Sequence, residues 1–322
     1  MNPDILNFFG LTKSFRQTTF LETPQSKQLT QNIKAAIHQG GIVALTGMVG
    51  SGKTTLLRKI REQLLEEKQV VVSRSLSTDK KQVSIGTLYT ALFYDLVKEK
   101  NFSIPTQAEK RERKFLEIIK KQGKPIALFI DEAHDLHHKT LVSLKRLIEL
   151  TDDTKQTLCV IVAGHPKLGN DLRRPSMEEI GARSQIFTIT NLSENKTRYC
   201  EWLIKQCCEK DNKPQNVILP EALEFLANSL VTPLQINYYL TQALEKAYLV
   251  GCKPLSLEII QSVLSPDIDG IEAKLTRHGY NVSALCEILS AKPNEIRSFF
   301  HGCINPTKAQ EFNNEIHKLG VI

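Results

Sequence analysis

The sequence lacks the features of a membrane protein, a secreted protein or a protein stabilised by a bound metal ion. No apolar run approaches the roughly 18 to 20 residues that span a bilayer, and the N-terminus MNPDILNFFG has neither the basic start nor the apolar core of a signal peptide. The 7 cysteines are odd in number and include no C-x-x-C pair, which argues against a disulfide framework or a zinc site. We therefore expect a cytoplasmic protein with no membrane contact.

Composition places the chain among ordinary globular proteins. Of 322 residues, 41% are hydrophobic and 24% are charged. At roughly 100 to 200 residues per domain, a chain of this length is expected to form about two domains. The net charge of +7 is compatible with binding to nucleic acid. Charge alone favours a mildly basic soluble protein equally well.

A glycine-rich loop follows the apolar run 42–45 in the stretch GGIVALTGMVGSGKTT. Its spacing fits G-x-x-x-x-G-K-[ST], and the helical pattern TTLLRKIREQLLEEK follows it, as in a P-loop. Backbone N–H groups of such a loop surround phosphates, Lys53 reaches the β and γ phosphates of ATP, and the Thr54 hydroxyl holds Mg²⁺. The predicted nucleotide-binding residues are Gly47, Met48, Val49, Gly50, Ser51, Gly52, Lys53, Thr54 and Thr55.

A second motif, PIALFIDEAH over residues 125–134, is an apolar strand that ends in two carboxylates. It looks like a Walker B motif, in which Asp131 holds Mg²⁺ and Glu132 polarises the attacking water. We expect a strand beside the P-loop strand to present these carboxylates, and the long gap after the P-loop leaves room for an additional strand. Together the two motifs predict a nucleotide-hydrolysing core.

Residues 156–163 read as another buried strand, which ends at His165. By position, His165 is the candidate for the polar residue that senses the γ-phosphate. Arg183 lies just ahead of the last predicted strand, 185–189, where a neighbouring subunit's ATP would receive an arginine finger. Arg173 and Arg174 are the second choices, and a plain surface arginine is the alternative.

Two further patterns favour solvated surface over a site. The stretch 97–114 holds six basic residues interrupted by three glutamates, so a solvated helix face is favoured over a phosphate-binding surface, and the stretch remains only a candidate DNA contact. His134 and His138 have the i, i+4 spacing of a metal pair but no evident third ligand. Surface histidines are therefore favoured over a zinc site.

The order of elements predicts three parts. Residues 1–190 alternate strands and helices, which indicates a parallel α/β sheet around the P-loop. The aromatic cluster in residues 1–25 packs either against the adenine end of the nucleotide site or within an ordinary core. Residues 191–264 form a small helical lid, and residues 271–322 form a separate all-helical block.

The C-terminal block resembles a helix-turn-helix, with helices over 282–289 and 295–301. If the second helix enters a major groove, Lys292, Asn294, Arg297 and Ser298 are placed to meet bases and phosphates. Glutamates nearly balance the basic residues of the block, so a protein-interaction domain is an equal alternative.

The order of motifs resembles the ExeA-like branch of AAA+ ATPases, which includes the transposition ATPases of the TnsC, TniB and MuB type. FFGL, FLETPQS, LTGMVGSGKTTLLR, IALFIDEAHDL and VIVAGHPKL carry the resemblance, over about residues 1–250. It implies an AAA+ fold with a helical lid, ATP and Mg²⁺ as cofactors, and self-association into a ring or helical filament. Related lids place a sensor arginine where this chain has Gln235, a weak stand-in.

ExeA itself would continue into a membrane helix and a cell-wall-binding domain, whereas this sequence ends in a small helical block. The resemblance therefore favours a cytoplasmic member that binds duplex DNA without sequence preference and works with a transposase and a target-selection protein. Two other functions stay open: an ATP-switched protein scaffold without DNA binding, and a replication-initiator-like loader.

Overall fold

The computed structural model describes residues 1–75, 84–97, 102–133, 136, 138–190, 192, 196–264, 270–300 and 304–320. These residues form two compact units. The α/β unit comprises Thr23–Gly47 and Lys53–Ile189, and the helical unit comprises Met1–Glu22, Met48–Gly52 and Thr190–Ile322. Residues 1–22 thus group with the helical unit and not with the sheet.

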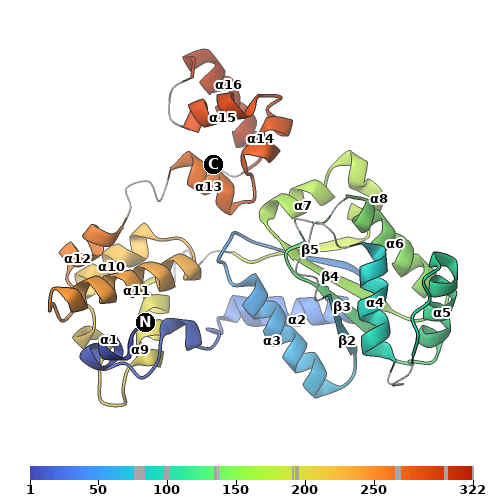
Figure 1. Ribbon diagram of the computed structural model, residues 1–322, viewed down its shortest axis with the longest axis horizontal. Helices are drawn as coiled ribbons and strands as arrows, with labels where there is room; N and C mark the ends of the chain where they lie inside the picture. Colours follow the sequence, from blue (N-terminus) through green and yellow to red (C-terminus); the bar gives the residue numbers. More distant parts are fainter. Residues whose placement is uncertain are drawn as a thin grey trace. The chain divides into compact units, whose positions relative to one another are not determined.

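The α/β unit is built on one five-stranded parallel sheet in the order β2-β3-β4-β1-β5 (Figure 1). This topology is typical of AAA+ proteins and confirms the predicted fold class. The expectation that the Asp131 strand lies beside the P-loop strand is wrong, because β4 lies between them. The strands are β1 (Gly41–Thr46), β2 (Val71–Arg74), β3 (Ile126–Ile130), β4 (Leu158–Gly164) and β5 (Ser184–Thr188).

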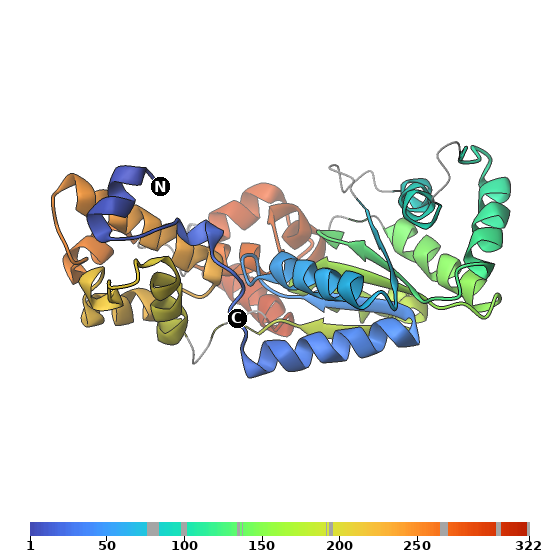
Figure 2. The same ribbon diagram turned by 90° about the horizontal axis from the view of Figure 1, so that it is seen from below.

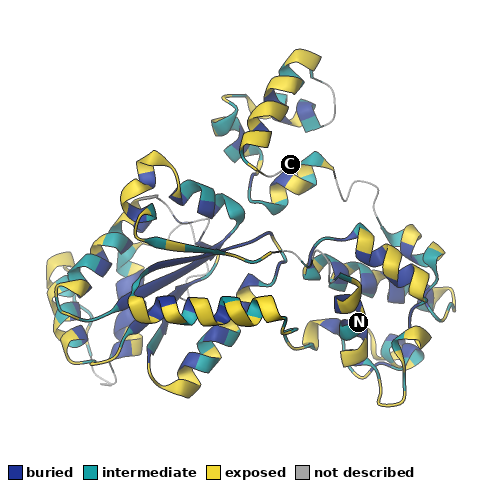
Figure 3. Cartoon of the chain, turned by 180° about the vertical axis from the view of Figure 1, so that it is seen from behind, coloured by how far each residue is buried: buried dark blue, intermediate teal, exposed yellow. Residues whose placement is uncertain are grey.

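The central strands form because they are continuous apolar runs. Every residue of β3 and β4 is buried, as is all of β1 except Gly41, and Figure 3 shows these strands in dark blue. Strands buried on both faces read as unbroken Val, Ile and Leu segments, which is why the sequence locates them within about two residues.

Helices cover both faces of the sheet. The helices α2 (Pro24–Gln39) and α3 (Lys53–Glu67) lie side by side against one face (Figures 1 and 2). The other face packs against α4 (Ile85–Leu96), α6 (His138–Asp152) and α7 (Pro166–Leu172), and α5 (Ala108–Lys120) packs on α4 and α6. The short helices η4 (Pro175–Met177) and α8 (Glu178–Gly181) lead into β5.

The N-terminal aromatic cluster belongs to the core of the helical unit. Phe9, Leu11 and Phe15 are almost fully buried among residues of the helices α9 to α12. Thr12 N donates to Cys207 O at 2.7 Å, and Asn212 Nδ2 donates to Phe9 O at 2.8 Å. Core packing is therefore the role of this cluster. The helices of this part are α1 (Pro3–Phe9), η1 (Phe15–Gln17), α9 (Lys196–Cys207), η6 (Pro214–Asn216), α10 (Pro220–Ser229), α11 (Pro233–Leu249) and α12 (Leu257–Val263).

The last four helices have a hydrophobic core of their own. Leu275, Tyr280, Leu285, Ile296 and Phe312 are at its centre. The helices are α13 (Ile271–Arg277), α14 (Val282–Ile288), α15 (Pro293–Phe300) and α16 (Pro306–Lys318). Within the described ranges, no helix of the chain is long and apolar enough to cross a membrane.

Candidate nucleotide site

The predicted P-loop joins β1 to α3, as the motif requires. Gly50 and Gly52 have φ of 79° and 97°, a backbone conformation that suits glycine and lets the loop turn tightly into the helix. The helix begins at Lys53, so its first N–H groups and the positive end of its dipole face the loop. Ser51 is buried, and its hydroxyl has no hydrogen-bond partner among the described residues.

Lys53 is folded back onto the loop that precedes it. Its side chain is only 7% exposed, and Nζ donates to Gly47 O at 2.8 Å. Burial lowers the pKa of Lys53, and the negative charges of Glu132 and Asp131 act in the opposite direction. The two carboxylates of the second motif are thus close enough to Lys53 to affect its charge.

Glu132 has an unusual backbone conformation. Its φ is 57°, in the left-handed region that residues other than glycine rarely adopt, and its N–H donates to Asp131 Oδ1 at 3.0 Å. The side chain of Glu132 is exposed, whereas Asp131 is half-buried. Such strain persists where the surroundings impose it, and it concentrates at functional sites.

Strand register brings the predicted residues to one edge of the sheet. Thr46 is the register partner of Gly164, Gly47 N donates to Gly164 O at 3.2 Å, and Ile130 is the partner of Val162. The P-loop, His165 and Asp131 therefore follow the carboxyl ends of the neighbouring strands β1, β4 and β3. His165 is half-buried and is the N-cap residue of α7, where its side chain makes no capping hydrogen bond.

These residues fit Mg-ATP. The buried Ser51 hydroxyl, the glycine conformations and the start of α3 form a cradle for phosphates. Thr54 and Asp131 line one pocket and offer a hydroxyl and a carboxylate, which are hard oxygen ligands suited to Mg²⁺.

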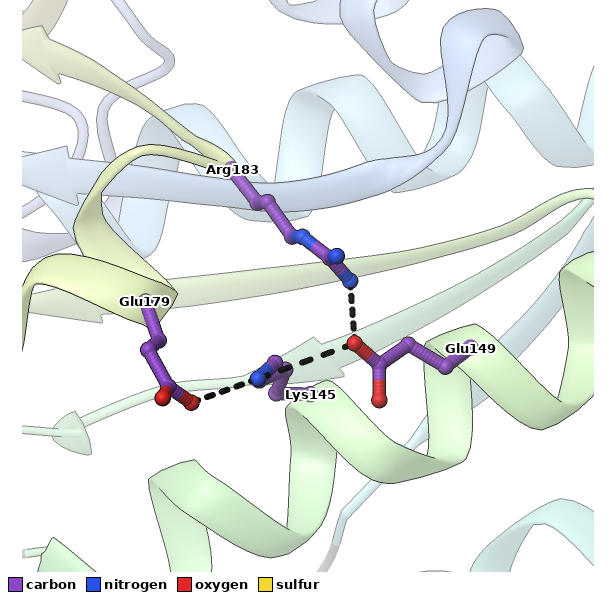
Figure 4. Close-up of polar contacts among 4 residues, drawn as sticks. All are labelled: Lys145, Glu149, Glu179 and Arg183. Atoms are coloured by element: carbon purple, nitrogen blue, oxygen red, sulfur yellow. Dashed lines mark hydrogen bonds and ion pairs between the residues drawn. The ribbon is translucent and has the colours of Figure 1, made fainter.

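Arg183 lies where the sequence places it, between α8 and β5, and it is bound within its own chain (Figure 4). Its Nη1 donates to Glu149 Oε1, and the same oxygen lies 3.7 Å from Lys145 Nζ, which also contacts Glu179 at 2.6 Å. The side chain of Arg183 is still 56% exposed. Of the alternative arginines, Arg174 pairs with Asp171 at 3.1 Å, whereas Arg173 is exposed and has no ion pair among the described residues.

Gln235 has a structural role at the start of α11. Its Oε1 accepts from Val231 N at 2.9 Å and from Thr232 N at 3.1 Å, while Thr232 Oγ1 accepts from Gln235 N. This is a capping box, which satisfies backbone donors that the helix leaves open.

The remaining candidates lie on surfaces. Arg113 and Lys114 of α5 pair with glutamates of the same helix, as a solvated helix face would. In the C-terminal block, Lys292, Asn294 and Arg297 are exposed and Ser298 is half-buried. His134 and the side chain of His138 lie outside the described residues. Among the residues that the structure describes, no group of three or more His, Cys, Asp or Glu side chains could hold a metal ion.

One feature of the site was absent from the sequence prediction. Arg58, Arg61 and Arg74 line the same pocket as Thr54 and Asp131. Arg58 and Arg61 have the i, i+3 spacing of one helix face, which is a signal in the sequence. Arg74 lies at the end of β2, so its position beside Arg58 and Arg61 depends on the fold and is not evident from the sequence.

Comparison with known proteins agrees with this geometry. Residues 34–171 match the family described as AAA domain. General secretion pathway protein A of Aeromonas hydrophila is 28% identical over 151 residues, which are 45% of this chain and 26% of that protein. The matched stretch thus spans about a quarter of the relative.

Solved structures share the fold at low sequence identity. Cdc6p from Pyrobaculum aerophilum has a TM-score of 0.54 at 16% identity, covering 99% of this chain and 85% of that chain. Drosophila ORC bound to DNA has a TM-score of 0.55 at 12% identity, and the match covers 99% of this chain and 78% of that chain. Aeropyrum pernix ORC1 in complex with DNA has a TM-score of 0.52 at 12% identity, and the match covers 93% of this chain and 84% of that chain. Residues 34–171 are therefore similar to the AAA domain family, in a chain that shares its fold with these solved structures.

Proposed function

We propose that the chain is an ATP-hydrolysing, DNA-binding regulator of transposition. In this proposal it assembles on duplex DNA as a ring or helical filament and recruits or activates a transposase, together with a target-selection protein. The observation that carries the hydrolytic part is the pair Asp131 and Glu132, held by a left-handed backbone at the same sheet edge as the P-loop.

Each residue has a defined part in hydrolysis. Mg-ATP, when bound, supplies the γ-phosphate that is transferred to water. Lys53 Nζ, which donates to Gly47 O and has two further N–H donors, would bind phosphate oxygens, Thr54 and Asp131 would hold Mg²⁺, and Glu132 would accept a proton from the attacking water. In this proposal His165 senses the γ-phosphate, and Arg183 completes the site of a neighbouring subunit.

Several observations support duplex DNA as the polymer on which the chain assembles. The net charge is +7, and two similarly folded proteins, Drosophila ORC and Aeropyrum pernix ORC1, are described with DNA. The motif order shared with transposition ATPases supports a transposase as the partner. A transposase gene beside the gene for this chain would strengthen that assignment, and its consistent absence among close relatives would weaken it.

Fluorescence anisotropy of a labelled duplex tests the proposal. We expect binding with ATP or a non-hydrolysable analogue, much weaker binding with ADP, and a steep loss of affinity as salt rises. Absence of binding at low salt with every nucleotide contradicts a DNA-binding function and favours a protein scaffold. Strong preference for one sequence favours a site-specific loader instead.

A further inference from the structure

Three arginines surround an open pocket at the edge of the α/β unit. Arg58 and Arg61 come from α3, and Arg74 is the last residue of β2. Thr54 and Asp131 line the pocket as well.

Strand register explains why Arg74 faces the arginines of α3. Arg74 is the register partner of Phe129, which also lines the pocket, so both side chains lie on the same face of the sheet. The preceding residue, Ser73, faces the opposite way and donates to Asp95 of α4 at 2.7 Å. On α3, the i, i+3 spacing places Arg58 and Arg61 on one side of the helix.

The cluster has an excess of positive charge. Three arginines and one aspartate line the pocket, which leaves a formal charge of 3 − 1 = +2. None of the three arginines forms an ion pair with a described residue. Burial lowers the pKa of Arg61, and the nearby positive charges of Arg74 and Arg58 lower it further, whereas Glu62 raises it. Like charges held together in this way favour an anion as their partner.

The cluster begins one helical turn beyond Thr54 on α3. A helix rises about 1.5 Å per residue, so along α3 Arg58 lies about 6 Å and Arg61 about 10 Å beyond Thr54, the Mg²⁺ ligand. Arg58 and Arg74 are exposed, so a large partner can reach them. Guanidinium groups bind phosphate oxygens in pairs, which suits a phosphodiester.

We infer that Arg58, Arg61 and Arg74 bind a backbone phosphate of duplex DNA beside the nucleotide site. This inference rests on the proposed DNA-binding function and adds the surface that performs it. Because Thr54 and Asp131 line the same pocket, DNA bound there is coupled to Mg-ATP, and each ligand changes the affinity of the other by the same factor.

The test compares two double variants of the full chain. Arg58→Gln with Arg74→Gln removes two charges from the pocket at exposed positions. Arg198→Gln with Lys205→Gln removes two charges from the exposed side of α9 and is the matched control, since neither residue forms an ion pair within the described part of the chain. Duplex affinity is measured from 50 to 300 mM salt, on the order of the range where phosphate contacts dominate, with a non-hydrolysable ATP analogue present. Affinity for a fluorescent form of the analogue is measured without DNA.

We expect the pocket variant to bind duplex about tenfold or more weakly, with a salt slope smaller by about 1 to 2. Its affinity for the analogue without DNA falls by a smaller factor than its affinity for duplex, and the α9 variant binds duplex much more tightly than the pocket variant. Equal duplex affinity and slope for the two variants overturn the inference. A loss of analogue affinity with an unchanged duplex slope also overturns it, because the arginines then serve the nucleotide. If the wild type itself fails to bind duplex, the proposed function has failed before the variants are compared.

Discussion

The guanidinium group of Arg183 is hydrogen-bonded to the carboxylate of Glu149 in the same chain, across 34 residues of sequence. Glu149 lies near the end of α6, and Arg183 lies just before β5. An arginine that serves a neighbouring subunit must exchange this partner for a phosphate. Because the pair is partly exposed, the exchange costs little, about 0.2 to 1 kcal/mol.

Arg183→Ala is therefore expected to separate catalysis from stability. If Arg183 is the finger proposed above, turnover in the assembled state falls by about 10³-fold, the effect of losing an arginine finger, while the free energy of unfolding changes by less than about 1 kcal/mol. Steady-state hydrolysis and urea denaturation measure the two effects. Arg173→Ala is the control, because Arg173 is exposed and has no ion pair in the described structure. Loss of turnover in Arg173→Ala with full turnover in Arg183→Ala would move the finger to Arg173.

Glu149→Gln weakens the partner that holds Arg183. If release of Arg183 limits the assembled enzyme, this variant reaches a given turnover at a lower protein concentration than the wild type. The affinity of the single chain for nucleotide stays unchanged, since Glu149 lies outside the P-loop. A titration of hydrolysis against protein concentration measures this shift. An identical titration curve would show that the pair does not restrain assembly.

Glu132→Gly tests whether the left-handed backbone at Glu132 is strained for function. Glycine adopts this conformation without the cost of a side chain, so the free energy of unfolding rises by about 0.5 to 1 kcal/mol while hydrolysis is lost. Lys155→Gly is the matched control: its φ is 58° and the residue is exposed. It should gain similar stability and keep its hydrolysis. Wild-type turnover in Glu132→Gly or Glu132→Gln would remove Glu132 as the base.

Lys53 carries a stability cost that depends on pH. Because burial lowers its pKa in the folded chain below the ordinary 10.5, the folded state holds this proton less tightly than the unfolded state does. The cost is present in full at neutral pH and declines as pH rises from the lowered pKa toward 10.5. Without nucleotide, Lys53→Met should be more stable than the wild type near pH 7, with a difference that narrows near pH 10. It should also bind ATP at least about tenfold more weakly, since it loses a charged hydrogen bond to phosphate. Urea denaturation at pH values near 7 and near 10 measures the difference in unfolding free energy between the variant and the wild type. A difference that does not change with pH would contradict the expected stability cost of Lys53.

Gln235→Ala distinguishes a helix cap from a nucleotide sensor. Loss of the capping box at α11 should lower the free energy of unfolding by about 1 kcal/mol and leave ATP affinity unchanged. Thermal denaturation and nucleotide titration measure both quantities. A large fall in ATP affinity would give Gln235 a sensor role, which the lack of an arginine in residues 231–235 puts in doubt.

The sequence predicts the strands and the P-loop well because their signals are local. The apolar runs that become β1, β3 and β4 are unbroken, and the glycine spacing defines the loop between β1 and α3. Strand order is a property of the whole sheet and not of any one strand, so the strand motifs did not reveal that β4 lies between β1 and β3.

Partners distant in sequence account for what the prediction missed. The aromatic residues near the N-terminus signal burial, but the sequence does not reveal that Phe9 and Phe15 pack among the helices that follow residue 190. Thr232 and Gln235 have the spacing of a capping box, so the sequence offers a helix cap as an alternative to a nucleotide-sensing role for Gln235 in the lid. The pairing of Arg183 with Glu149 follows from the packing of α6 and α8, not from any motif.

Binding of labelled duplex by Glu132→Gln, compared in ATP and in ADP, measures whether the bound nucleotide controls assembly on DNA. We expect the variant to bind ATP but to hydrolyse it slowly, and we therefore predict a stable assembly on duplex DNA in ATP, visible by electron microscopy, and release in ADP. Equal binding in both nucleotides, or none in either, would contradict an ATP-gated assembly on DNA.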